Sequence, residues 1–410
     1  MNRREWLMLN GGMAALGRGS LLAQQPPPKE LGALPITPDK VLLKDYRPRS
    51  IYKIPRTDIK KAKYPIIDTH HHGSLAPSRE ALDKTVRMMD AVGMERTVVF
   101  LGTASPEKIS ASRQAYSRYA DRFDIWCDFD LSGSDQPGFG PKAVKALEGC
   151  HREGAVGVGE IIDKGRGLFF EQPGIREGTV FGPHVDDPRM DALYDQCRRL
   201  GMPISVHVAE PFWNYQPMDN TNDGLMNSYT WTVKSGPGLR GHDEMIASLE
   251  RVLTNHPKTI FMACHLANLE YDLTRLGQIM DRHPNLYADL GGRSCAQIAP
   301  QARCAATFFQ QHPDRVLYGT DWPYTQLLFT TSFRILESSD DHFYIWDPVV
   351  PGTTIAFEDY HYYDGEIGGY ANDFDYHWPL YGLALPDDIL RKVYGENARK
   401  VFEKARANAA

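Results

Sequence analysis

The sequence predicts an α/β protein whose core is a (β/α)8 TIM barrel with long βα-loop insertions. From residue 64 onward, short apolar segments alternate with amphipathic segments, and the alternation repeats eight times. Near-continuous apolar runs are typical of parallel strands buried on both faces, and the amphipathic segments show the 3.6-residue period of helices. Eight strand–helix units is the number that closes a barrel, and extended loops bring such barrels to about 400 residues.

The eight units follow one another along the chain. The first four pair "PIIDTHHH" with "SREALDKTVRMMDAVG", "RTVVFLG" with "EKISASRQAYSRYA", "FDIWCDFD" with "PKAVKALEGCHREG", and "AVGVGEII" with "DPRMDALYDQCRRLG". The last four pair "PISVHVAE" with "HDEMIASLERVLTNHP", "TIFMACHLA" with "LEYDLTRLGQIMDRHP", "LYADLGG" with "PQARCAATFFQQHP", and "RVLYGTDWP" with "PDDILRKVYGENARKVFEKAR". We therefore assign residues 63–406 to the barrel.

Three connections after strands are unusually long, namely residues 163–187, 210–241 and 322–385. All three are expected at the carboxyl-terminal face of the barrel, where active sites lie. The last is an aromatic-rich insertion that can line a substrate pocket or bury a subunit interface. If the chain forms a homo-oligomer, we expect the interface in its 340–382 part.

The N-terminal region has two parts. Residues 1–24 carry the paired Arg3 and Arg4 before a weakly apolar stretch, as in a twin-arginine signal peptide. This pattern predicts export to the periplasm, and the alternative is a cytoplasmic protein with a tail. Residues 25–62, rich in Pro, Lys and Arg, are expected to pack over the barrel as an extension. No later run reaches the roughly 18 apolar residues of a transmembrane helix, so no membrane partner is expected.

Composition narrows the class of partner. A net charge of −6 gives no footprint for nucleic acid or an anionic membrane, so we expect a small-molecule substrate. The six cysteines contain no CxxC pair. We interpret them as buried thiols rather than as a zinc cluster or a disulfide framework.

Titratable residues end several of the apolar runs. In "PIIDTHHHG", His70 and His72 share one face of the chain, whereas His71 points the other way. The other strand-end residues are Glu160 in "AVGVGE", His207 in "PISVHV", His265 in "IFMACH" and Asp321 in "VLYGTD". Because the carboxyl ends of barrel strands meet at one mouth, these side chains are expected to converge. Imidazoles with one carboxylate suit Zn²⁺ and leave a position open for water.

These motifs resemble the amidohydrolase superfamily, specifically the amidohydrolase-related family (amidohydrolase 2) that contains decarboxylases and lactonases. The segments that carry the resemblance are "DTHHH", "GMPISVHV", "FMACHLAN", "PNLYADLGG", "VLYGTDWP" and "ILRKVYGENARKVF". They span residues 64–404 in matching order and spacing. The resemblance implies a distorted (β/α)8 barrel of the metal-dependent hydrolase type with a divalent metal, usually zinc.

The resemblance also implies roles for individual residues. His70, His72, His207 and Asp321 would bind the metal, and Asp321 would also act as general base toward the water. His265 would bind or polarise the substrate, or orient the catalytic water. Mn²⁺ and Fe²⁺ suit the same ligands, so the identity of the metal stays open.

Glu160 departs from the family pattern, since this strand end is not acidic in many relatives. It either bridges a second metal ion or orients a ligand through a hydrogen bond. Asp68 is expected to support the metal ligands through a hydrogen bond.

Three residues are candidates for binding the substrate. Arg293 follows "LGG", where a guanidinium can grip a substrate carboxylate or form a surface salt bridge. Trp213 and Trp322 lie in loops at the same face, where an indole ring stacks on a substrate ring or packs the loop.

The leading hypothesis is a metal-dependent hydrolase that acts on a small polar or acidic lactone, ester or amide through metal-activated water. One alternative is a metal-dependent non-oxidative decarboxylase, a lyase acting on an aromatic or unsaturated carboxylic acid. A second alternative is a non-catalytic barrel that binds a ligand. The two enzymatic hypotheses share the fold and nearly the same ligands, so the fold does not separate them.

Overall fold

The computed structural model describes residues 37–43, 46, 48–168, 182–228, 233, 238–292, 294–322, 324–345 and 378–409. The chain divides into two units, residues 1–43 and 44–410. The described part of the first unit holds one short 3-10 helix, Pro38–Lys40. The expected signal at residues 1–24 lies outside the described residues.

The second unit contains eight parallel strands in its described part. They are β1 Ile66–Asp68, β2 Met94–Phe100, β3 Phe123–Trp126, β4 Val158–Asp163, β5 Ile204–Val208, β6 Phe261–Ala263, β7 Leu286–Asp289 and β8 Val316–Leu317. Each strand pairs with the next in two ladders, β1 to β3 and β4 to β8. The Cys127 amide donates to the Gly157 carbonyl at 3.1 Å between the ladders, and the Thr69 amide donates to the Tyr318 carbonyl at 2.9 Å. These bonds close the sheet into the (β/α)8 barrel that the sequence predicts.

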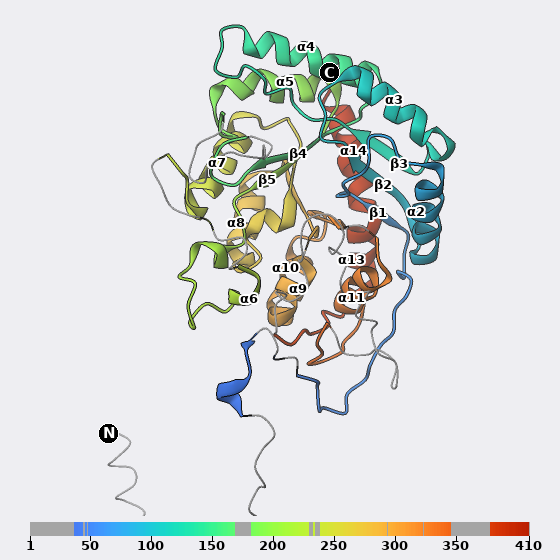
Figure 1. Cartoon of the computed structure of the whole chain (residues 1–410), viewed down its shortest axis with the longest axis vertical. Helices are drawn as coiled ribbons and strands as arrows, with labels where there is room; N and C mark the ends of the chain where they lie inside the picture. Colours follow the sequence, from blue (N-terminus) through green and yellow to red (C-terminus); the bar gives the residue numbers. More distant parts are fainter. Residues whose placement is uncertain are drawn as a thin grey trace, which may run out of the picture. The chain divides into compact units, whose positions relative to one another are not determined.

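Helices surround the strands (Figure 1). They are α2 Arg79–Val92, α3 Pro106–Tyr116, α4 Phe139–Arg152, α5 Asp191–Leu200, α6 Leu225–Ser228, α7 His242–Asn255, α8 Leu273–Arg282, α9 Ser294–Ile298, α10 Ala302–Gln311, α11 Gln326–Glu337, α13 Asp387–Arg391 and α14 Asn397–Ala407. Among the described residues, no helix combines the length and the apolar character that crossing a membrane requires.

Helix α2 shows how the sequence builds these units. The Ser78 side chain accepts a hydrogen bond from the Ala81 amide at its start, and Gly93 ends it in the left-handed conformation. Leu82, Val86 and Met89 recur at helical spacing and are buried toward the strands.

Helix α11 lies inside the region that the sequence analysis treated as one aromatic-rich connection, residues 322–385. Phe329, Phe333 and Leu336 are spaced for one helix face and are buried. The Thr325 side chain caps the first turn by accepting from the Leu328 amide. Residues 346–377, which hold half of the Phe, Trp and Tyr side chains of the connection, lie outside the described residues.

The barrel interior forms its own apolar cluster beneath the strand ends. Inward-facing side chains from six strands pack there with Ala398, Val401 and Ala405 of α14. The strand residues are Ile67, Val98, Phe100, Trp126, Met262, Tyr287 and Leu317. Helix α14 therefore covers one end of the barrel, and polar strand-end residues occupy the other.

Residues 48–62 include a segment that contacts the barrel at Thr57. The Thr57 amide and hydroxyl donate to the two carboxylate oxygens of Asp340, at 2.6 and 2.7 Å. The same carboxylate accepts from the Arg334 guanidinium at 2.8 Å, and both charged side chains are buried.

The six cysteines are free thiols. Cys127, Cys150, Cys197, Cys264 and Cys295 are buried as the sequence predicts, but Cys304 is exposed on α10. The prediction is wrong for Cys304 because its position falls on the outer face of an amphipathic helix.

A left-handed turn follows β6. Residues 265–268 have φ values of 55°, 52°, 58° and 52°, and none is glycine. Each non-glycine residue in this conformation costs about 1–2 kcal/mol because its Cβ crowds the backbone. The turn is held by the Asn268 side-chain amide, which donates to the Val208 carbonyl at 2.9 Å, and by His242, which bonds the Asn268 carbonyl at 2.9 Å.

We predict that Ala267→Gly leaves the free energy of unfolding nearly unchanged, because relief of about 1–2 kcal/mol of strain offsets the lost methyl burial and the flexibility of glycine. The matched control is Ala143→Gly in α4, which is equally buried at 1% exposure but right-handed. That variant is expected to lose about 2 kcal/mol. Urea denaturation compares the two, and equal losses would show that the turn is unstrained.

Candidate metal centre

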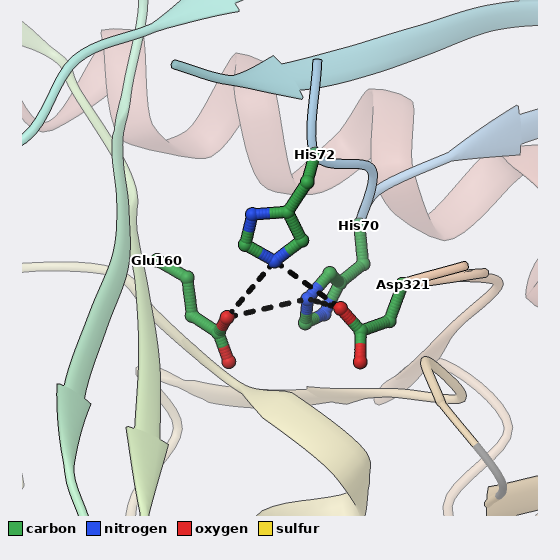
Figure 2. A group of neighbouring side chains, drawn as sticks. All are labelled: His70, His72, Glu160 and Asp321. Atoms are coloured by element: carbon green, nitrogen blue, oxygen red, sulfur yellow. Dashed lines mark hydrogen bonds and ion pairs between the residues drawn. The ribbon is translucent and has the colours of Figure 1, made fainter. Parts of the chain in front are cut away.

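Six strand-end side chains meet at the mouth of the barrel opposite α14. His70 and His72 follow β1, and Glu160 lies within β4. His207 lies in β5, His265 follows β6 and Asp321 follows β8. Figure 2 shows His70, His72, Glu160 and Asp321 directed toward one another.

A first donor group consists of His70, His72, Glu160 and Asp321. The Nε2 atoms of His70 and His72 lie 3.1 and 3.2 Å from Asp321 Oδ1. The same two nitrogens lie 3.7 and 3.1 Å from Glu160 Oε2. His72 is the open side of the group, because its side chain is 46% exposed whereas that of His70 is fully buried.

A second donor group consists of Glu160, His207 and His265. Nδ1 of His207 lies 2.8 Å from Glu160 Oε1, and Nε2 of His265 lies 3.7 Å from the same oxygen. Glu160 therefore directs one carboxylate oxygen to each group.

Asp289, at the end of β7, is a site residue that the sequence analysis did not single out. Its Oδ2 lies 3.0 Å from Nδ1 of His70, and its side chain is fully buried. The signal was present in "LYADLGG", where an acidic residue ends an apolar strand like those at the other strand ends.

Asp68 hydrogen-bonds to the backbone on both sides of the cluster. Its carboxylate accepts from the His70 amide at 3.0 Å, from the Thr320 amide at 3.0 Å and from the Tyr324 hydroxyl at 2.8 Å. Burial raises the pKa of Asp68 to about 6, although these donors oppose the shift. The carboxylate ties the turn that carries His70 to the turn that carries Asp321.

Two glycines let the neighbouring strands approach His70. A Cβ added at Gly291 would lie 2.8 Å from His70 Nδ1, and one at Gly319 would lie 3.0 Å from His70 Cβ. Real side chains almost never make contacts this short, so a larger residue at Gly291 would displace the imidazole ring.

Histidines and carboxylates of the cluster shift each other's pKa values, so that the histidines hold protons more tightly. Burial lowers the pKa of His70, but the charges of Asp321 and Asp289 outweigh it and raise that pKa well above the ordinary value. Burial also opposes protonation of His72 and His265. Hydrogen bonds to Asp321 and Glu160 nevertheless raise the pKa of His72 to about 9, and a hydrogen bond to Glu160 with the charge of Asp321 raises that of His265 to about 9.

Both carboxyl groups of the cluster show the opposite shift. Burial raises the pKa of Glu160 and of Asp321, but the neighbouring histidines outweigh it and hold each pKa below its usual range. In contrast, burial and two neighbouring imidazoles lower the pKa of His71 to about 3. His71 stacks on Tyr324 with ring centroids 4.4 Å apart, so it belongs to the wall of the site.

More titratable groups surround this cluster. Lys164 Nζ lies 2.6 Å from Glu210 Oε1, and Glu210 Oε2 lies 3.9 Å from His207 Nε2. Burial raises the pKa of Asp128, at the end of β3, to about 7, and that of the fully buried Glu270 also to about 7. The mouth is therefore polar and rich in carboxylates.

The structure describes two of the three residues that are expected to bind substrate. Trp322 directly follows Asp321, and Trp213 lies on the short helix Phe212–Tyr215 after β5. The Trp213 ring packs against Trp378 at a centroid distance of 5.5 Å. Arg293 lies outside the described residues.

The residues of the cluster fit a divalent cation. Nε2 of His70 is buried and has no hydrogen-bond partner among the described residues, yet it faces the two carboxylate oxygens already described. Imidazole nitrogens and carboxylate oxygens are the ligand types that Zn²⁺, Mn²⁺ and Fe²⁺ accept. A cation between these atoms would satisfy all of them.

A sequence profile of the family described as "Amidohydrolase" matches residues 67–404 of this chain. No curated protein matches the sequence significantly.

Solved structures with a similar fold include decarboxylases and a hydrolase. The 5-carboxyvanillate decarboxylase LigW from Sphingomonas paucimobilis is 13% identical, and the match covers 83% of this chain and 99% of that protein at a TM-score of 0.45. The 5-carboxyvanillate decarboxylase from Novosphingobium aromaticivorans, solved with manganese and 4-hydroxy-3-methoxy-5-nitrobenzoic acid, is 15% identical, with coverages of 84% and 99% and a TM-score of 0.43.

A probable 2-pyrone-4,6-dicarboxylic acid hydrolase from Acinetobacter baumannii, solved with citric acid, is 13% identical, with coverages of 82% and 99% and a TM-score of 0.43. Because all three TM-scores are below 0.5, these likenesses do not bear on the reaction of this chain.

We predict that Zn²⁺ binding at pH 7 releases at least two protons, because His70 and His72 are protonated in the metal-free protein and must lose their protons to bind metal. Affinity should therefore rise as the pH increases from 7 toward the pKa of His72, about 9. Calorimetry in two buffers of different ionisation enthalpy counts the protons.

The control is His71→Gln. Since the pKa of His71 is about 3, the native residue has no proton to release at pH 7, and the count should not change. Release of less than one proton by the wild-type protein would contradict the prediction.

Proposed function

The chain belongs to the amidohydrolase family and is an enzyme, and from this premise we propose that it is a metal-dependent hydrolase. Its substrate would be a small polar or acidic lactone, ester or amide, cleaved by water. The metal would be a divalent cation, with Zn²⁺ preferred among the ions that suit these ligands.

The position of Glu160 is the observation that carries this proposal. Its Oε2 faces the histidines after β1, and its Oε1 faces His207 and His265. A carboxylate placed in this way can hold two cations side by side, an arrangement that recurs in hydrolytic enzymes. We therefore assign His70, His72 and Asp321 to one cation, and His207 and His265 to a second, with Glu160 shared.

A bound divalent ion would lower the pKa of water toward about 7 and polarise a substrate carbonyl. We propose that Asp321 accepts the proton of the attacking water. Its Oδ1 faces the two β1 histidines, and its Oδ2 lies 3.7 Å from Nε2 of His265. The side chain is 23% exposed, so one side remains open to the mouth. The depressed pKa of Asp321 keeps the carboxylate ionised, so its oxygens can only accept hydrogen bonds from that water.

Partly exposed polar side chains at the rim of the mouth favour the binding of a polar substrate. Lys164 is 32% exposed beside Glu210, and His72 leaves nearly half of its side chain open. We retain Arg293, Trp213 and Trp322 as proposed substrate contacts, because all three belong to loops that follow strands.

We predict that the enzyme incorporates one solvent ¹⁸O atom per turnover when dihydrocoumarin, 4-nitrophenyl acetate and other small lactones and esters are screened. Asp321→Asn should lower kcat by about 10²–10⁴-fold, as loss of a general base does. The exposed Asp388→Asn, on α13, is the control and should leave kcat unchanged. Release of CO₂ from an aromatic carboxylic acid without ¹⁸O gain would establish the decarboxylase alternative instead.

We predict two equivalents of metal per wild-type chain, measured by elemental analysis after purification without chelators. Glu160→Gln should lose at least one equivalent because an amide is a poor bridging ligand. Glu210→Gln is the matched control, since this neighbouring carboxylate is not among the donor groups and should leave two equivalents. One equivalent in both wild type and Glu160→Gln would refute the bridging role.

A further inference from the structure

We propose that Asp289 is a positioning residue that fixes the tautomer and orientation of His70, so that the Nε2 lone pair of His70 faces the metal position. The inference rests on the proposed function only in placing a cation beside His70. It assigns a physical role to Asp289, which is not one of the proposed metal ligands.

The contacts of Asp289 show how it can act on His70. Its Oδ2 lies 3.0 Å from Nδ1 of His70. Its Oδ1 accepts from the His265 amide at 3.0 Å and from the Gly291 amide at 2.8 Å. The side chain is fully buried, so water does not compete for these bonds. The carboxylate is therefore held in place by backbone donors on one side and directed at the imidazole on the other.

The hydrogen bond between Asp289 and His70 sets the tautomer of His70. An ionised carboxylate can only accept hydrogen bonds, so Nδ1 of His70 must carry the proton. In the neutral ring, Nε2 then presents a lone pair. That lone pair faces Asp321 Oδ1 at 3.1 Å and Glu160 Oε2 at 3.7 Å. Three acceptors that face one another are stable only when a cation or proton lies between them.

The packing around the ring removes its freedom to turn away. Gly291 leaves no room for even a methyl group beside Nδ1, since a Cβ there would lie 2.8 Å from it. The His70 ring also stacks on His265 at a centroid distance of 5.1 Å and meets Phe100 edge-on at 5.1 Å. Asp289 contacts both the ring of His70 and the backbone of His265, and so connects the two donor groups.

Asp289→Asn tests the tautomer without changing the shape of the side chain. The amide oxygen can still accept from the His265 and Gly291 amides, which preserves the backbone contacts. The amide NH₂ would then face Nδ1 of His70 and donate to it. This places the ring proton on Nε2, which is the nitrogen that must bind the metal.

The chain offers a matched control at the end of β4. Asp163 is also fully buried, bonds Nδ1 of His184 at 2.9 Å and accepts from the Gly165 amide at 3.0 Å. His184 is not among the residues that could hold a metal. Oδ2 of Asp163 also accepts from the Val185 amide at 3.1 Å. Asp163→Asn therefore removes a buried aspartate–histidine bond, and in addition a backbone bond, at residues outside the donor groups.

The experiment measures the Zn²⁺ affinity of the full-length protein against a competing chelator, together with the thermal midpoint of each metal-free form. We expect Asp289→Asn to bind Zn²⁺ about 10–100-fold more weakly, the usual effect of losing the carboxylate behind a ligand histidine. We expect the metal-free midpoint of Asp289→Asn to fall no further than that of Asp163→Asn, and Asp163→Asn to keep wild-type affinity. Wild-type affinity in Asp289→Asn would overturn the inference.

A second variant decides the question if Asp289→Asn fails to fold. Gly291→Ala keeps Asp289 but pushes the His70 ring out of line, and should also weaken Zn²⁺ binding, whereas unchanged affinity would overturn the inference. If the wild-type protein binds no Zn²⁺, Mn²⁺ or Fe²⁺, the proposed function fails as a whole. If the wild type binds metal and Asp289→Asn binds it equally well, this inference alone fails.

Discussion

The site depends on a concentration of buried negative charge at the carboxyl ends of the strands. Glu160 and Asp289 are almost entirely removed from water, and Asp321 is largely so. Isolated charges in such a place would cost several kcal/mol each. Four histidines face these carboxylates, and protons or metal ions shared between the two kinds of group make the burial tolerable. The barrel supplies the rigid frame that keeps these groups together.

Much of the fold could be predicted because its physical rules act over short stretches of sequence. Alternation of apolar and amphipathic segments indicated the eight units, and the rule that parallel strands end at one face indicated which histidines and carboxylates meet. The roles of those residues remain predictions. The spacing of Phe329, Phe333 and Leu336 is typical of a helix face, but residues 322–385 were treated as one connection whose aromatic side chains line a pocket or bury a subunit interface, so helix α11 was missed.

Other features depend on contacts distant in sequence or on backbone conformation. Asp289 is 219 positions from His70, so nothing local reveals that it supports that ring. The left-handed turn at Leu266 and Ala267 contradicts the intrinsic preference of both residues for right-handed conformations. Tertiary bonds from His242 and Asn268 hold it, and these form only once the barrel is assembled. The direction of each histidine nitrogen is likewise a property of the packed site.

Helix α14 has a consequence for how the protein is made. It follows all eight strands in the sequence, and it covers the inner cluster to which β1, near residue 67, already contributes. Closure of the barrel also requires backbone hydrogen bonds between the segment after β1 and the segment after β8. The chain through Asp321 must therefore have left the ribosome before His70 can meet that residue. Folding is dominated by contacts distant in sequence, which makes it slow, and the donor cluster assembles late in it.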